Sequence, residues 1–174
     1  RIQVMAGLYH SGHVRPGQSH PLVQWMYHPE KTPTTSRNEA IRALPTLPET
    51  GTGVQSDALS IRFMVDEARR VGRNSTIYLI LISDTAWNEC LHVGKSGHEE
   101  VTACLKSLQE ELDDRFHVTL VAVGQRGIKG FDQVVDKVIS VPAGGLGDPA
   151  KVAQEIGSYV ATCLRERQKL VTRR

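Results

Sequence analysis

Three polar residues directly follow the most apolar run of the sequence. After Ile77–Ile82 (IYLILI) come Ser83, Asp84 and Thr85. In an open parallel sheet, ligands bind beyond the carboxyl ends of the strands, and carboxylate and hydroxyl oxygens suit a hard cation such as Mg²⁺. The sequence therefore offers Asp84 as a metal ligand at a strand end. In the alternative interpretation, Asp84 ends the strand and caps the next turn with its side chain.

A second candidate is the loop Gly51–Gly53, which precedes a predicted helix starting near Asp57. A glycine-rich loop at a helix N-terminus exposes backbone N–H groups, so it could hold an anion or place the hydroxyl of Thr52 at a site. The loop lacks the lysine of a phosphate-binding P-loop. The alternative is an ordinary flexible entry into the helix.

Trp87 and Asn88 occupy the polar loop after the same apolar strand. An exposed tryptophan there would suit an anchor for a protein partner. The alternative is that the indole ring packs beneath the loop.

Scattered histidines give no metal or catalytic motif. His10, His13, His20 and His28 lack cysteine or carboxylate ligands at helical spacing, so we interpret them as loop histidines and predict no zinc site. No Ser/His/Asp or Cys/His set can be identified either. The chain is therefore predicted not to be an enzyme.

Apolar periodicity predicts the elements that would position these residues. Ile77–Ile82 and Val118–Val123 are almost uninterrupted apolar runs, typical of central strands buried on both faces. Residues 58–68 and 101–112 show the three-to-four spacing of amphipathic helices, the first of them stopped by Gly72. Val138–Val141 predicts a short strand, and Asp148 and Pro149 predict the start of a closing helix.

The first part of the chain predicts a β-hairpin at the edge of the sheet. Its strands are Ile2–Tyr9 and Leu22–His28, joined by a hydrophilic loop, and a short helix is expected around Arg37–Leu44. The predicted fold is α/β and Rossmann-like, with a mainly parallel central sheet, helices on both faces and an antiparallel edge strand.

Composition limits the function classes. The 174 residues carry 21 basic and 19 acidic side chains, a formal net charge of +2, so neither nucleic acid nor an anionic membrane is a predicted partner. The basic residues of the tail, 165–174, are interpreted as a solvated helix end. Three cysteines without close pairs predict a reducing compartment, the cytoplasm. No apolar run reaches the length of a membrane span.

From Gly51 onward the chain resembles a von Willebrand factor A domain. The resemblance rests on GTGVQSDAL before a helix, IYLILISDTAWNE, VTLVAVG, KVISVP and a closing helix, in that order. It covers most of the chain and implies a single domain over residues 1–174. The family's metal-ion-dependent adhesion site uses an Asp-x-Ser-x-Ser loop, a threonine and an aspartate. Asp84 matches the aspartate, and Thr52 matches the threonine if the loop shifts by one residue, because Gly53 otherwise takes that position.

The family's first strand, its Asp-x-Ser-x-Ser loop and its first helix have no match here. Without the Asp-x-Ser-x-Ser loop, the expected Mg²⁺ site lacks most of its ligands. Without the first strand, which is central in the family's sheet, two strand edges are expected to be open. It also predicts that the chain is the later part of a longer polypeptide. The expected strand-end binding surface would be excluded if Ile77–Ile82 lay at the border of its sheet, or if Asp84 lay far from the glycine-threonine turn.

The resemblance implies an interaction module whose upper face binds a protein partner, with or without a bridging Mg²⁺. Thr52 and Asp84 are the expected metal ligands. The expected partner-binding residues are Gly53, Ser83, Thr85, Trp87 and Asn88. Because intracellular members of the family often serve ATPase machines, the expected partner is an AAA+ ATPase or another complex subunit. One alternative is a doubly wound α/β enzyme or nucleotide-binding domain that uses the same strand ends. A third possibility is a degenerate structural domain with no ligand.

Overall fold

The structure is a computed structural model, which describes residues 5–9, 23–31, 39, 57–87, 94–124, 130–141 and 149–171. The chain divides into two compact units that are interleaved along the sequence. The first unit contains residues 1–77 and 87–108, and the second contains residues 78–86 and 109–174.

The second unit is built on a parallel sheet of three strands, in the order β3-β4-β5. The strands are β3 (Ile77–Ser83), β4 (Phe116–Val123) and β5 (Lys137–Val141). β4 and β5 pair in parallel, with Thr119 opposite Lys137 and Val123 opposite Val141. The predicted α/β class with a mainly parallel sheet is therefore confirmed, and the arrangement is compatible with a Rossmann-like fold.

β4 is the central strand of this sheet. Leu120, Val121 and Ala122 are each 0% exposed, so residues on both faces of the strand are buried. The prediction of a central strand over Val118–Val123 is confirmed.

β3 lies at the edge of the sheet, and the prediction that Ile77–Ile82 is a central strand buried on both faces is wrong. β3 is hydrogen-bonded to β4, and in the described part of the chain no strand pairs with its other side. Ile80 and Ile82 are 40% and 56% exposed, whereas Leu81 is buried. The physical reason is that an apolar run favours a buried strand but does not determine which strands lie on either side of it.

An aspartate side chain extends the pairing of β4 with β5. The backbone N–H of Val118 donates to Oδ2 of Asp136 at 2.6 Å, and the N–H of Asp136 donates to the carbonyl of Val118 at 2.9 Å. Because Val118 is 0% exposed, its N–H would otherwise be buried without a partner from the next strand.

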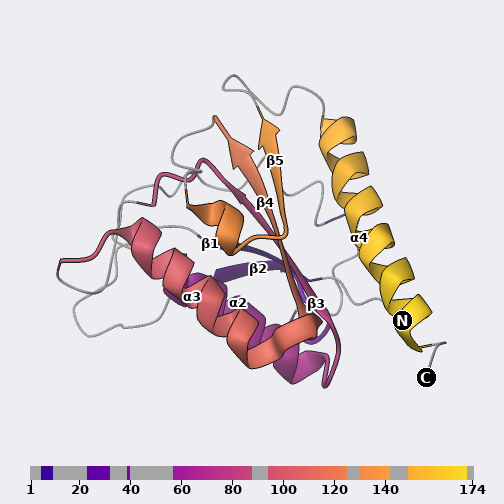
Figure 1. Cartoon of the computed structure of the whole chain (residues 1–174). Coiled ribbons are helices and arrows are strands. Elements are labelled where there is room, and N and C mark those ends of the chain that lie inside the picture. The colour runs from indigo at the N-terminus through magenta and orange to yellow at the C-terminus, as the bar shows by residue number, and fades with distance from the viewer. Residues whose placement is uncertain are drawn as a thin grey trace. The chain divides into compact units, whose positions relative to one another are not determined.

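One face of the sheet is covered by α4 (Pro149–Val171), which begins at the predicted proline. Val152 and Ile156 of α4 pack against a buried cluster of Val121, Ile139 and Val141. Figure 1 shows that α4 runs antiparallel to β4 and β5. Two short 3₁₀ helices complete this unit, η2 (Asp113–Arg115) and η3 (Phe131–Gln133).

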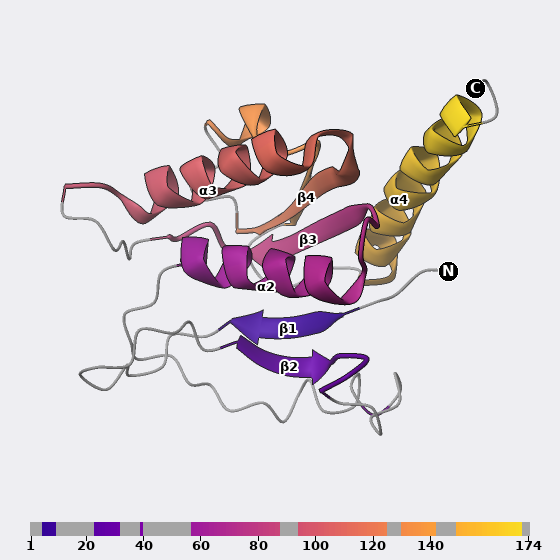
Figure 2. The same ribbon diagram turned by 90° about the horizontal axis from the view of Figure 1, so that it is seen from below.

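The first unit holds an antiparallel pair, β1 (Ala6–Tyr9) and β2 (Val23–Tyr27), with α2 (Asp57–Val71) against β1 (Figure 2). The predicted hairpin pairing is confirmed, but the two strands form a sheet of their own rather than the edge of a larger one. Within the described ranges, β1, β2, β3 and β5 each have a strand neighbour on one side, so the two sheets together have four open edges. The two open edges expected from the unmatched first strand of the family therefore stay a prediction.

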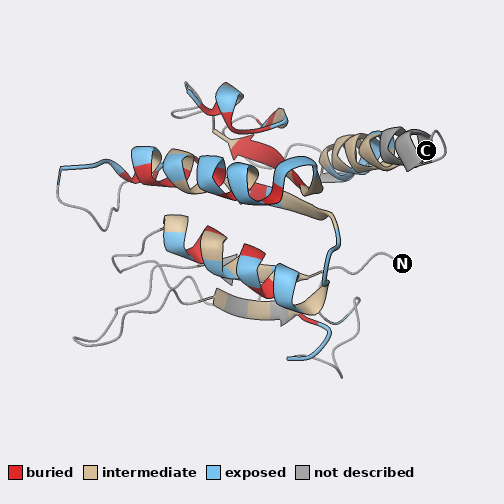
Figure 3. Cartoon of the chain, turned by 60° about the horizontal axis from the view of Figure 1, so that its bottom comes forward, coloured by how far each residue is buried: buried red, intermediate tan, exposed pale blue. Residues whose placement is uncertain are grey.

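α3 (Gly97–Leu112) shows the predicted amphipathic pattern. Val101, Leu105, Leu108 and Leu112 form a buried stripe along one side of the helix (Figure 3). Ser96 and Glu99 form a capping box at its start, in which each side chain accepts a hydrogen bond from the backbone N–H of the other residue. Of the short helix predicted around Arg37–Leu44, the structure describes Glu39, which is helical.

Candidate functional site

The polar residues at the carboxyl end of β3 form a hydrogen-bonded turn. The N–H of Thr85 donates to Oγ of Ser83 at 3.0 Å, and the N–H of Ala86 donates to Oδ1 of Asp84 at 3.0 Å. The hydroxyl of Thr85 donates to the Asp84 carbonyl at 2.6 Å. Asp84 therefore caps this turn, as the structural alternative in the sequence predicts.

The turn presents one of its three polar side chains to solvent. Asp84 is exposed, Ser83 is half-buried and Thr85 is 5% exposed. Thr85 also has a φ of 61°, in the left-handed region that residues with a Cβ rarely adopt. The strained backbone and the turn hydrogen bonds fix the direction in which the Asp84 carboxylate leaves the sheet.

The described residues do not by themselves fit a Mg²⁺ site. They contain no group of three or more histidine, cysteine, aspartate or glutamate side chains that could hold a metal ion. At the end of β3 they supply a single carboxylate, Asp84, one oxygen of which accepts a turn hydrogen bond. Mg²⁺ needs several oxygen ligands in near-octahedral geometry. Thr52 and Gly53, which the sequence pairs with Asp84, lie outside the described residues, so the predicted pairing is untested.

Trp87 is 6% exposed, and its ring lies 6.1 Å from that of His98 in the same unit. This burial agrees with the alternative in which the ring packs rather than anchoring a partner. Asn88, its predicted neighbour in the site, lies outside the described residues.

The exposed apolar residues Ile80 and Ile82 on β3 are a feature that the sequence analysis missed. Leu59 and Phe63, on α2, are the other large apolar side chains that the structure describes as exposed, at 36% and 41%. Ile80 and Ile82 differ from them in lying on an edge strand that leads directly to Asp84. No signal in the sequence predicts this exposure, because the run from Ile77 to Ser83 contains no charged residue, proline or glycine of the kind that natural edge strands usually carry.

An ion-pair cluster in the first unit, formed around the buried residues His28 and Glu67, was also missed. His28 is 0% exposed, and its Nδ1 accepts hydrogen bonds from the N–H groups of Glu30 and Lys31 at 3.1 and 3.0 Å. Its Nε2 lies 3.3 Å from Oε1 of Glu67, which also contacts Nζ of Lys31 at 2.6 Å. Oε2 of Glu67 accepts from Nε of Arg70 at 2.8 Å.

These contacts set the protonation states in the cluster. Hydrogen bonds from Arg70 and Lys31 lower the pKa of Glu67 to about 2. Burial lowers the pKa of His28, although the nearby Glu67 charge acts in the opposite direction. Since Nδ1 of His28 accepts two N–H groups, the neutral ring carries its proton on Nε2, facing Glu67. The cluster joins the turn after β2 to α2, and His10, His13 and His20 lie outside the described residues.

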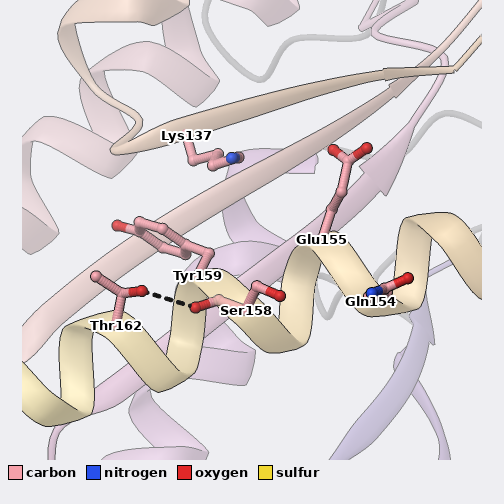
Figure 4. A pocket seen from close by; sticks show the side chains of 6 residues that line it. All are labelled: Lys137, Gln154, Glu155, Ser158, Tyr159 and Thr162. Carbon is pink, nitrogen blue, oxygen red and sulfur yellow. Dashed lines mark hydrogen bonds between the residues drawn. The ribbon is translucent and has the colours of Figure 1, made fainter.

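A shallow pocket of about 350 Å³ lies between β5 and α4. Figure 4 shows Glu155 and Tyr159 rising from α4 toward the strands, near Lys137. Burial raises the pKa of Tyr159, and a hydrogen bond with Cys163 acts in the same direction. Lys137 begins β5, so the pocket opens near the amino end of this strand. Its lining does not include Ser83, Asp84 or Thr85.

Each helix that the structure describes lacks the length or the apolar character that a membrane span requires. No protein-family model, curated protein or solved structure matches the chain. The resemblance to a von Willebrand factor A domain therefore stays a prediction from the sequence.

Proposed function

We propose that the chain is a protein-interaction module that binds its partner through the exposed side of β3 and the turn at Asp84. The observation that carries the proposal is the exposure of Ile80 and Ile82 on an uncharged edge strand. The sequence resemblance adds a partner class to test, an AAA+ ATPase or another subunit of a complex.

Exposed isoleucines on an edge strand favour association. Covering the remaining surface of Ile80 and Ile82 would contribute about 2 kcal/mol, from the free energy of burying apolar area. An unprotected edge strand is also prone to pair with another chain. These two properties support a binding surface at β3 more strongly than the buried Trp87 or the single carboxylate Asp84 does.

The proposal predicts that Ile82→Lys weakens peptide binding. A displayed library of random peptides of about 18 residues, five helical turns, would be selected on the immobilised chain. The selected peptides are expected to bind Ile82→Lys roughly tenfold more weakly, because a charge replaces the larger part of the apolar contact that Ile80 and Ile82 together provide. Fluorescence anisotropy with labelled peptides measures the dissociation constants.

The matched control is Ser140→Lys, which places the same charge at an exposed position on β5. It is expected to bind the peptides as the parent chain does. Failure to select any peptide, or equal binding by parent and Ile82→Lys, would contradict the proposed function.

Mg²⁺ is not required by this proposal, since Asp84 alone supplies too few oxygen ligands. Calorimetric titration with Mg²⁺ is expected to give the same heats for the parent and for Asp84→Ala. A saturable heat in the parent that disappears in Asp84→Ala would restore the bridging metal ion predicted from the sequence resemblance.

A further inference from the structure

The exposed isoleucines of β3 lie on the face of the sheet that α4 covers. Tyr78 of β3 stacks on His117 of β4, with ring centroids 5.0 Å apart and an interplanar angle of 18°, so the two side chains share a face. Alternate residues of a strand point to the same face. Ile80 and Ile82 therefore share the face of Tyr78, and Val121 shares the face of His117. Val121 packs against α4.

α4 covers β4 and β5 but leaves this part of β3 exposed. Val152 and Ile156 of α4 contact residues of β4 and β5, whereas Ile80 and Ile82 stay 40% and 56% exposed. In α/β folds, helices that share one face of a sheet lie side by side, with axes about 8 to 10 Å apart. The place beside α4 and over β3 is thus the position that a second helix would take.

Helix geometry identifies the residues of α4 that face the position over β3. Glu155, Ser158 and Thr162 line the pocket with Lys137, so that flank faces β5. Successive residues are rotated by about 100°, which puts the opposite flank toward β3, because β3 and β5 are on opposite sides of β4. The residues on that flank are Ala153, Gly157, Val160 and Leu164.

This flank has the composition of a helix contact. None of its four residues is charged or polar, although Ala153 and Gly157 are exposed and Val160 and Leu164 are half-buried. A Cβ atom added at Gly157 would meet nothing within 4 Å, so the surface there is open. Small residues let a neighbouring helix approach closely, whereas a solvated helix flank normally carries charged side chains.

We propose that an amphipathic α-helix of a partner protein binds beside α4 and over β3. This inference rests on the proposed function and names the partner's binding element. The β3–α4 surface that receives the helix consists of Ile80, Ile82, Ala153, Gly157, Val160 and Leu164.

The charge of Asp84 gives the helix a direction. Its exposed carboxylate lies at the carboxyl end of β3, the end of the sheet from which α4 starts. A carboxylate stabilises the N-terminus of a helix through the macrodipole. The partner helix therefore runs antiparallel to β3, with its N-terminus near Asp84 and its apolar stripe on Ile80 and Ile82.

Other occupants fit this surface less well. A strand added to the edge of β3 would pair with its backbone but would leave the uncharged flank of α4 exposed. The α4 of a second copy already uses its apolar side on its own sheet, and its outward side carries the exposed residues Gln154 and Arg165. A separate amphipathic helix satisfies both β3 and the flank of α4.

The test uses a displayed library of binary-patterned amphipathic peptides of about 18 residues. Peptides selected on the parent chain are measured by anisotropy against Gly157→Leu, which fills the point of closest helix approach. Binding is expected to weaken about tenfold or more. Ser158→Leu, the same introduced side chain on the other flank of α4, is expected to stay within about twofold of the parent. Circular dichroism should show that the bound peptides gain helix.

The outcomes separate the inference from the proposed function. Two results would contradict the inference that the partner binds as a helix and would leave binding at β3 supported. The first is that Ile82→Lys weakens binding while Gly157→Leu does not, and the second is that the bound peptides are extended. If no peptide is selected, or if both variants bind as the parent does, the inference and the proposed function both fail. The circular dichroism spectrum of Gly157→Leu alone checks that the variant folds, as the open space at Gly157 predicts.

Discussion

Replacing Phe131 by alanine is expected to lower the free energy of unfolding of the second unit by about 3 to 5 kcal/mol. Phe131 is 0% exposed and is among the largest fully buried side chains of the described residues. Its carbonyl accepts hydrogen bonds from the N–H groups of Val134 and Val135, so the backbone of η3 is fixed and is expected to collapse only partly into the cavity. Urea denaturation of parent and variant measures the difference.

The control for Phe131→Ala is Phe63→Ala, the same chemical change at a side chain that is 41% exposed. Its effect is expected to stay near or below about 1 kcal/mol, because most large effects of single substitutions come from the core. Equal losses in the two variants would show that Phe131 does not have the core role assigned to it.

Acidification is expected to remove up to about 3 kcal/mol of stability from the first unit between pH 4.5 and pH 2. The pKa of Glu67 falls from 4.5 to about 2 in the folded chain, so its contribution is fully present above pH 4.5. The unfolded chain binds this proton first as the pH falls. Folding is then progressively disfavoured until the folded carboxylate is protonated as well.

His28 adds to the acid sensitivity at higher pH. Its pKa is lowered in the folded chain, so the unfolded chain binds a proton first as the pH falls below 6.5. Protonation of Nδ1 would also break the two hydrogen bonds from Glu30 and Lys31. Both groups therefore make the first unit less stable in acid.

The comparison variant for this prediction is Glu67→Gln, whose amide does not titrate. Denaturation at several pH values should show that Glu67→Gln is less stable than the parent at neutral pH. Its free energy of unfolding should also change less between pH 4.5 and pH 2. Parallel profiles for parent and Glu67→Gln would remove Glu67 as the source of the acid sensitivity.

The sequence predicts where individual helices end and begin, because the residues at those positions are typical of helix ends. α2 ends at Val71, and the N–H of Gly72 donates to the Ala68 carbonyl at 2.8 Å, as expected for a helix stopped by glycine. α4 starts at Pro149, where proline lacks the N–H that the first turn of a helix leaves unpaired. These features need no distant partner, so spacing and residue type suffice to predict them.

The place of β3 in its sheet could not be predicted in the same way. The run IYLILI has the composition of a central strand, but sheet order depends on which strands are present on either side. The same limit applies to the site. Asp84 could be placed at a strand end from the sequence, whereas the contacts of His28 with Glu67 join residues 39 positions apart and leave no local pattern.

The carboxylate of Asp136 has a consequence for the alignment of β4 with β5. By accepting the N–H of Val118, it adds one rung to the ladder that starts at Thr119 and Lys137. A shift by one residue would separate this carboxylate from its donor and turn Ile139 and Val141 away from α4. The carboxylate of Asp136, directly before β5, thus favours the alignment in which Ile139 and Val141 face α4.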